Sequence, residues 1–310
     1  MEPVISVEDL RKSYDDIPRI HGITFDVRRG EILGFLGTNG AGKTTTIEIL
    51  EGYRSRNGGH VSVLGVDPAR ATRDWRNRIG LVLQECELDP VYTVRETVAI
   101  FARYFFSPTD IEATIDAVGL TDKADSRVGQ LSGGQKRRLD VGVGLVGDPE
   151  ILFLDEPTTG LDPLARREMW TLIERLRDAG KTIFLTTHYM DEAQHLADRI
   201  IILRAGEIAA QGTADELSAS LGYHTEVTFD PYKGIDLARL SSVVGRAVTA
   251  NESSVRFETD DVQDELRMLL EWAQREHVML TNLQAIRPSL DDVFVRLAGE
   301  PASEMNEVAS

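Results

Sequence analysis

Short hydrophobic runs recur along the first two thirds of the chain, and polar or glycine-rich segments separate them. Their length and their content of β-branched residues are typical of strands. Helical spacing of apolar residues separates several runs, as in Ala165–Asp178 and Asp191–Ala197. Strands that alternate with helices predict an α/β fold, with a mainly parallel sheet covered on both faces. The strand-like runs are Val4–Val7, Ile23–Val27, Ile32–Phe35, Val61–Leu64, Ile79–Leu83, Ile151–Leu154, Ile183–Thr186 and Ile200–Leu203.

The pattern changes twice along the chain. From about residue 93 to residue 140 it predicts a helical insert. The composition shifts near Leu221 and Gly222, and the following runs HTEVTFD, SSVRFET, VQDELRMLLEWAQREH and VMLTNLQAI predict a small α+β module with a ferredoxin-like arrangement. We therefore predict a first domain over residues 1–221, an accessory domain over 222–300 that ends with the helix PSLDDVFVRLAG, and a flexible tail over 301–310.

Charge and cysteine content limit the classes of function that the chain can have. The 51 acidic and 34 basic side chains give a formal net charge of −17, which disfavours general nucleic-acid binding. A single cysteine, Cys86, rules out an internal disulfide and suits a reducing cytoplasm. The sequence opens without a secretory segment and contains no run of about 20 apolar residues that would span a membrane. We expect a cytoplasmic chain, whose role at a membrane would require a partner.

Residues Gly37–Thr44 read GTNGAGKT and match the phosphate-loop pattern G-x-x-x-x-G-K-[ST], with a strand before it and a helix after it. Glycines let backbone N–H groups converge on an anion, and the start of the helix adds the positive end of its dipole. Lys43 places a cation between the β- and γ-phosphates, and the Thr44 hydroxyl suits Mg²⁺. The expected cofactors are ATP and Mg²⁺.

Two carboxylates follow the apolar strand ILFLD. Asp155 ends this strand, and a carboxylate beside a phosphate loop can hold Mg²⁺ or its waters. Glu156 comes next and can orient or deprotonate a water that attacks the γ-phosphate. We interpret Glu156 and Lys43 as catalytic residues.

A further motif, Leu131-Ser132-Gly133-Gly134-Gln135, reads LSGGQ and enters a helix. By itself this is an ordinary helix entry, although Ser132 and the free N–H groups can also bind a phosphate. Together with the phosphate loop and the Asp155–Glu156 pair, it resembles the ATPase subunits of ABC transporters, whose signature is LSGGQ. The resemblance spans roughly residues 4–220.

The resemblance implies roles for further residues. Tyr14 takes the place of the aromatic residue that stacks on adenine, and Gln84 that of the glutamine that senses Mg²⁺ and the γ-phosphate. Asp162 matches the loop that joins two halves of a composite site, and His188 matches the histidine that contacts the γ-phosphate. The expected nucleotide-binding set is Tyr14, Gly37, Thr38, Asn39, Gly40, Ala41, Gly42, Lys43, Thr44, Thr45, Gln84, Ser132, Gly133, Gly134, Gln135 and Asp162; the expected metal set is Thr44, Gln84 and Asp155; and His188 joins Lys43 and Glu156 as catalytic.

The C-terminal module resembles that of the bacterial subfamily that exports drugs, antibiotics and polysaccharides, including daunorubicin-resistance ATPases. This resemblance implies an ATP-hydrolysing subunit that powers export of a drug, antibiotic, lipid or polysaccharide. It also implies a homodimer at the cytoplasmic face of the membrane and a separate permease. The alternative is a soluble ABC-type ATPase that acts as a switch or in translation or DNA repair. A switch that only binds nucleotide would not turn ATP over, so a turnover assay separates the two.

Overall fold

The computed structural model describes residues 3–84, 87–220, 225–231, 235–251 and 254–286. Contacts divide the chain into two compact units, Met1–Ala214 and Asp215–Ser310. The domain boundary predicted from composition falls within residues 221–224, outside the described residues, and stays a prediction. The predicted last helix and tail also lie outside them.

A six-stranded sheet forms the centre of the first unit, in the order β5-β6-β7-β3-β8-β9. Neighbouring strands from β5 to β8 are parallel, and β9 pairs with β8 in the antiparallel direction. The predicted mainly parallel sheet is therefore confirmed for this part of the chain. Its strands are β3 (Ile32–Gly37), β5 (Ile79–Val82), β6 (Ile151–Asp155), β7 (Thr182–Thr187), β8 (Arg199–Arg204) and β9 (Glu207–Gly212).

Three of the predicted strands do not join that sheet. β1 (Ile5–Tyr14), β2 (Ile17–Val27) and β4 (Gly58–Val63) form a separate antiparallel sheet in the order β2-β1-β4. The predicted mainly parallel sheet does not include these three strands, because β1 and β2 are joined without a helix. Asp15 and Asp16 alone connect them, both with positive φ (47° and 63°), as a two-residue hairpin turn requires.

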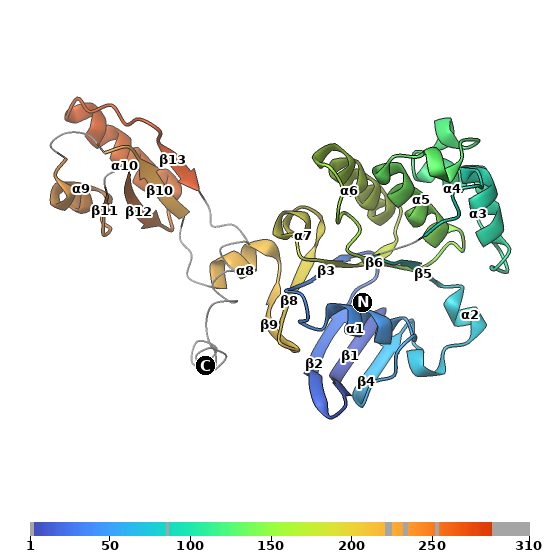
Figure 1. The fold of residues 1–310 in the computed structure, drawn as a ribbon. Helices are drawn as coiled ribbons and strands as arrows, with labels where there is room; N and C mark the ends of the chain where they lie inside the picture. Colours follow the sequence, from blue (N-terminus) through green and yellow to red (C-terminus); the bar gives the residue numbers. More distant parts are fainter. Residues whose placement is uncertain (1–2, 85–86, 221–224, 232–234, 252–253, 287–310) are drawn as a thin grey trace. The chain divides into compact units, whose positions relative to one another are not determined.

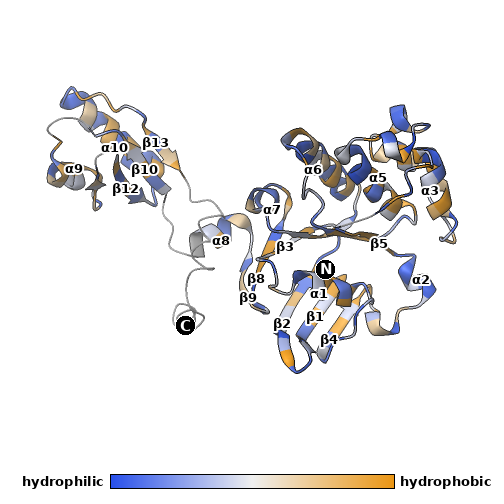
Figure 2. Ribbon diagram, in the orientation of Figure 1, coloured by the Kyte–Doolittle hydropathy of each residue, from blue (hydrophilic) through white to orange (hydrophobic). Residues whose placement is uncertain are grey.

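Two hydrophobic cores cover the faces of the six-stranded sheet. In β6, Leu152 and Leu154 pack on the side of the helical insert, whereas Ile151 and Phe153 pack on the side of the antiparallel sheet and α1. Figure 1 shows α5 and α6 on one side of the six-stranded sheet and the antiparallel sheet with α1 on the other. Figure 2 shows hydrophobic residues along the strands of the six-stranded sheet. Helices of this unit are α1 (Lys43–Leu50), α2 (Arg73–Arg76), α3 (Val94–Ala102), α4 (Ile111–Ala117), α5 (Gly133–Leu145), α6 (Pro163–Asp178) and α7 (Met190–Leu196), with 3₁₀ turns η1 (Pro68–Arg70), η2 (Thr121–Lys123) and η3 (Val128–Gln130).

The second unit contains a four-stranded antiparallel sheet in the order β11-β12-β10-β13. Its β-α-β-β-α-β element order and this strand order are those of the ferredoxin-like arrangement. Val227, Phe257, Leu240 and Trp272 share its core, so α9 and α10 cover one face of the sheet. The elements are α8 (Ala214–Ser220), β10 (Thr225–Phe229), α9 (Leu237–Val244), β11 (Thr249–Ala250), β12 (Val255–Thr259), α10 (Val262–Arg275) and β13 (Gln284–Ile286).

Candidate functional site

The phosphate loop connects the end of β3 to the start of α1 in the first unit. Gly40 and Gly42 have φ values of 81° and 112°, a left-handed region that glycine enters without strain. Gly42 is also the N-cap of α1, and it has no side chain to occupy the first N–H groups of the helix. Ala41 donates its N–H to the Thr38 carbonyl (3.1 Å), which closes the loop.

Lys43 lies inside the loop and is 6% exposed. Its Nζ donates to the Gly37 carbonyl (2.8 Å) and lies 3.5 Å from the Thr38 carbonyl. The same Nζ lies 3.5 Å from Glu156 Oε1. A cation is thus held between the loop and the end of β6, where an anionic ligand of the loop would meet it.

Asp155 is buried at the end of β6. The Thr186 hydroxyl donates to Asp155 Oδ1. Burial raises the pKa of Asp155 above its usual value; the Thr186 hydrogen bond opposes this shift, and the neighbouring charge of Glu156 adds to it. A divalent cation at this carboxylate would favour its ionised form. The described residues hold no group of three or more His, Cys, Asp or Glu suited to a metal.

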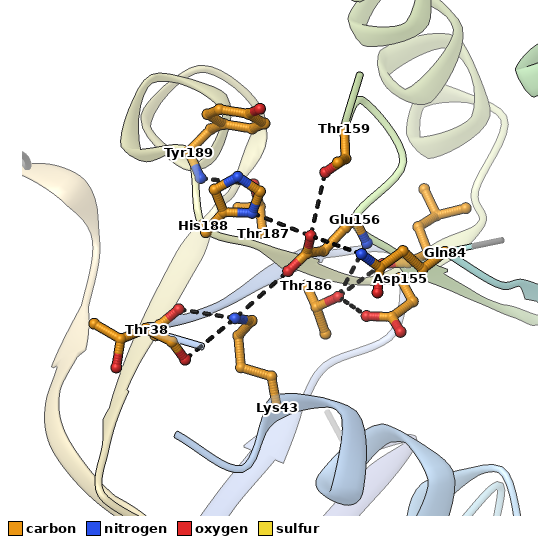
Figure 3. A network of polar contacts seen from close by, with 12 residues as sticks. Thr38, Lys43, Gln84, Asp155, Glu156, Thr159, Thr186, Thr187, His188 and Tyr189 are labelled. Atoms are coloured by element: carbon orange, nitrogen blue, oxygen red, sulfur yellow. Dashed lines mark hydrogen bonds and ion pairs between the residues drawn. The ribbon is translucent and has the colours of Figure 1, made fainter. Parts of the chain in front are cut away.

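Four side chains converge on the carboxylate of Glu156 (Figure 3). Oε2 lies 3.1 Å from His188 Nδ1, accepts a hydrogen bond from the Thr159 hydroxyl (3.2 Å), and lies 3.5 Å from the Gln84 amide nitrogen. Oε1 faces Lys43. β3, β6 and β7 lie side by side in the sheet, so their carboxyl ends bring the loop, Glu156 and His188 to one edge.

The backbone of Glu156 is held in an uncommon conformation. Its φ is 46°, in the left-handed region that residues other than glycine seldom adopt. The Glu156 N–H donates to both the carbonyl and the hydroxyl of Thr186, each at 3.1 Å. This bend turns the chain out of β6 and directs the carboxylate toward the loop.

A pocket of about 550 Å³ opens at this edge of the sheet. Tyr14 lies at it, and the Tyr14 and Thr45 hydroxyl oxygens are 3.5 Å apart. The lining residues are Tyr14, Arg19, Thr38, Asn39, Gly40, Gly42, Lys43, Thr44, Thr45, Gln84 and Glu156. Its size, its glycine-rich loop at the start of α1 and its buried lysine suit a nucleotide with phosphates.

The signature residues stand apart from this lining. Ser132 is exposed and caps α5: its Oγ accepts the Gln135 N–H (3.2 Å), and its own N–H donates to Gln135 Oε1 (2.9 Å). Asp162 is likewise exposed and caps α6 through the N–H groups of Leu164 and Ala165. Among the described residues, the lining includes neither Ser132–Gln135 nor Asp162.

Some residues of the site escape sequence reasoning. Arg19 lines the pocket from β2, and Thr159 and Thr186 bond the two carboxylates. Thr186 ends the predicted strand Ile183–Thr186, so its position at the sheet edge offered a signal. Arg19 offered none, because the hairpin β1–β2 brings it to the loop.

Comparison with known proteins identifies the family. A family model described as ABC transporter matches residues 20–159. The chain is 40% identical over 308 residues to the Nod factor export ATP-binding protein I of Rhizobium meliloti (strain 1021), which covers 95% of this chain and 88% of that protein. The chain belongs to the ABC transporter ATP-binding proteins. The ATPase is also 38% identical over 309 residues to the protein of that name from Paraburkholderia xenovorans (strain LB400), covering 96% of this chain and 98% of that protein.

Solved structures agree with this assignment. An ATP-binding subunit of an ABC transporter matches with a TM-score of 0.63 and 27% identity, covering 71% of this ATPase and 93% of that chain. cbiO1 from Clostridium perfringens, part of the ABC transporter complex cbiONQ, matches with a TM-score of 0.64 and 28% identity over 71% and 92%. A second family model, the ABC transporter domain-containing protein-like C-terminal domain, matches residues 225–289. The ATPase therefore uses ATP and Mg²⁺, and its family hydrolyses ATP to drive transport.

Proposed function

We propose that this ATPase energises export of a substrate through a separate membrane-spanning permease. The observation that carries the proposal is the convergence of Lys43, His188, Gln84 and Thr159 on Glu156 beside the phosphate loop. Export as the direction of transport is supported by the relatives, which are named Nod factor export ATP-binding proteins. Within the described residues, no helix is long and apolar enough to cross a membrane. We place the ATPase at the cytoplasmic face of the membrane.

The phosphate end of the nucleotide would occupy the loop. Residues Gly37–Thr45 present N–H groups to the phosphates, and Lys43 exchanges its contact with Glu156 for the β- and γ-phosphate oxygens. Thr44, Asp155 and Gln84 would hold Mg²⁺, which neutralises charge on those oxygens when it is bound.

Glu156 would orient or deprotonate the attacking water, because its carboxylate faces the loop and lies against His188. His188 would contact the γ-phosphate from the end of β7. Tyr14 would stack on adenine, and Arg19 would add a cation at the same pocket.

We further propose a homodimer with two composite sites. In one chain the exposed start of α5 at Ser132 and the exposed Asp162 stand outside the pocket lining. The start of α5 presents N–H groups that can bind a phosphate held by a second chain. Closure over ATP would move the helical insert and the permease bound to it. Residues 1–221 would carry this chemistry, and residues 222–300 would form an accessory domain.

Two substitutions test the site. Lys43→Ala removes the one fixed cation of the loop and is expected to weaken or abolish ATP binding in an equilibrium titration with a fluorescent ATP analogue. Glu156→Gln is expected to keep ATP binding and to lower the hydrolysis rate about 10²- to 10⁴-fold.

Glu150→Gln is the matched control for the second substitution. Glu150 precedes the opposite end of β6 and pairs with Arg78 and Arg29, so its loss should leave hydrolysis unchanged. Unaltered affinity in Lys43→Ala, or a wild-type rate in Glu156→Gln, would show that the chemistry lies elsewhere. Export itself is tested by reconstitution with the candidate permease, where hydrolysis should rise and transport should require an intact Glu156.

A further inference from the structure

Arg137 lies in the second turn of α5 and is 8% exposed. Its guanidinium donates to backbone carbonyls at the end of β6. Nε donates to the Pro157 carbonyl (2.9 Å), and Nη2 donates to those of Asp155 (2.9 Å) and Glu156 (3.2 Å). Three consecutive carbonyls around the bend at Glu156 thus accept hydrogen bonds from one side chain.

The same guanidinium reaches a second segment. Nη1 donates to the carbonyls of Leu83 (2.5 Å) and Gln84 (3.4 Å), just after β5. Asp140, one turn further along α5, lies 3.7 Å from Nη1. A single planar group therefore connects α5, the end of β6 and the segment that carries Gln84.

These contacts bear on the strained residue of the site. A left-handed conformation outside glycine is strained and persists only where its surroundings fix it. At Glu156 the N–H is fixed by Thr186, and the carbonyls on both sides of the bend are fixed by Arg137. The direction of the Glu156 carboxylate depends on this bend.

We propose that Arg137 is a positioning residue for ATP hydrolysis. It keeps the Glu156 carboxylate directed toward Lys43, and it joins both Glu156 and Gln84 to the helix that begins at the signature. A movement of α5 then reaches the carboxylate through one rigid group. This inference rests on the proposed role of Glu156 in hydrolysis.

Arginine suits this role better than lysine. Its guanidinium has five N–H donors in a fixed plane, whereas an ammonium has three donors on a flexible stem. In Arg137→Lys, at most three of the five carbonyls keep a partner. Because a misplacement of about 1 Å can cost about 100-fold in rate, we expect kcat to fall roughly 10- to 100-fold. KM for Mg·ATP should change by less than about threefold, since Lys43 and the loop are untouched.

A matched control is Arg56→Lys. Arg56 is partly buried and makes three hydrogen bonds, two to Asp67 and one to the Gly59 carbonyl, and it does not line the nucleotide pocket. Arg56→Lys should lower the melting temperature about as much as Arg137→Lys does, while its kcat stays within about twofold of the wild type.

A double-mutant cycle decides whether Arg137 acts through Glu156. Single-turnover hydrolysis is measured for the wild type, Arg137→Lys, Glu156→Gln and the double variant. If Arg137 positions Glu156, Arg137→Lys should lower the rate by less than about threefold when Glu156 is already glutamine. An equal loss in both backgrounds would overturn the inference.

The outcomes separate this inference from the proposed function. A wild-type rate in Glu156→Gln would remove the role of Glu156 itself. A slow Glu156→Gln with additive effects leaves that role intact and overturns only the role of Arg137. Arg137→Gln serves as a second variant. Failure of both Arg137 variants to fold, or unchanged kcat in a folded one, would likewise make Arg137 a structural residue and overturn the proposal.

Discussion

Glu51 is a buried acid near the site that the proposed mechanism does not use. It caps the end of α1 and is 8% exposed. Burial raises the pKa of Glu51 to about 8, and the charges of Asp155 and Glu48 add to the shift. The folded chain therefore keeps a proton on Glu51 at pH values where the unfolded chain has released it. The contribution of Glu51 to the free energy of unfolding falls as the pH rises from about 4.5 to 8, and it is fully lost above that window.

We predict that Glu51→Gln removes this pH dependence. Between about pH 5 and pH 8 the free energy of unfolding of the wild type, measured with urea, should fall relative to that of the variant by at most about 5 kcal/mol. Glu150→Gln provides a control of opposite sign, because the hydrogen bond from Arg78 lowers the pKa of Glu150. The difference in the free energy of unfolding between the wild type and Glu150→Gln should be constant between about pH 5 and pH 8. Parallel pH curves for the wild type and Glu51→Gln would contradict the prediction.

At the residue scale, the sequence predicted the residues that belong to local motifs. Gly40 and Gly42 show the backbone that a phosphate loop requires, and Ser132 caps its helix. Arg19 and Arg137 could not be predicted, since each reaches the site through a strand pairing or a helix packing that joins distant parts of the chain.

At the scale of elements, α5 packs on β5 through two glycines. A Cβ atom on Gly80 would lie 2.3 Å from the Gly144 carbonyl oxygen, and one on Gly144 would lie 3.1 Å from Val82 Cγ2. The closest neighbour of Gly80 is a backbone atom, so only a shift of the helix could accommodate a methyl group. Gly80 and Gly144 thus let α5 approach the sheet closely.

We predict that Gly80→Ala destabilises the ATPase by about 1–3 kcal/mol, as overpacking usually does. Gly58→Ala is the control: it also lies in a strand, and its Cβ would be 3.5 Å from Arg11 Cβ, an ordinary contact. That change should stay within about 0.5 kcal/mol. Urea unfolding compares the two variants with the wild type. Equal urea midpoints for the two variants would contradict the prediction, because α5 would then shift without a loss of stability.

The sequence predicted most elements but not how all of them are assigned to sheets. Runs such as Val61–Leu64 are strands as expected. However, β4 pairs with β1, although β3 and α1 lie between them in the sequence. Hydrophobic spacing is a local property and does not specify such a partner. The Asp15-Asp16 turn was the available signal, because a two-residue connection permits only an antiparallel pair.

At the scale of the whole molecule, the proposed composite site makes a prediction that one chain alone cannot meet. Glu156 faces the pocket of its own chain, whereas Ser132 stands outside the lining of that pocket. Ser132→Arg should keep ATP binding and block closure, because it places bulk and removes the cap at the start of α5. Glu156→Gln should bind ATP and accumulate as a closed dimer, since the neutral amide also relieves repulsion with the γ-phosphate.

A purified heterodimer of these two variants separates closure between chains from closure within one chain. If the signature acts on the opposite chain, the nucleotide on the Ser132→Arg chain meets an intact signature and an intact Glu156. That site escapes both lesions, so the heterodimer should hydrolyse ATP at up to about half the rate of the wild-type dimer. If each signature acts on its own chain, both sites carry one lesion and mixing restores nothing. ATPase activity is compared with both variant homodimers, and size analysis with ATP confirms that the heterodimer closes. A closed heterodimer no faster than the better homodimer would exclude action between chains, because its one intact combination would then be inactive.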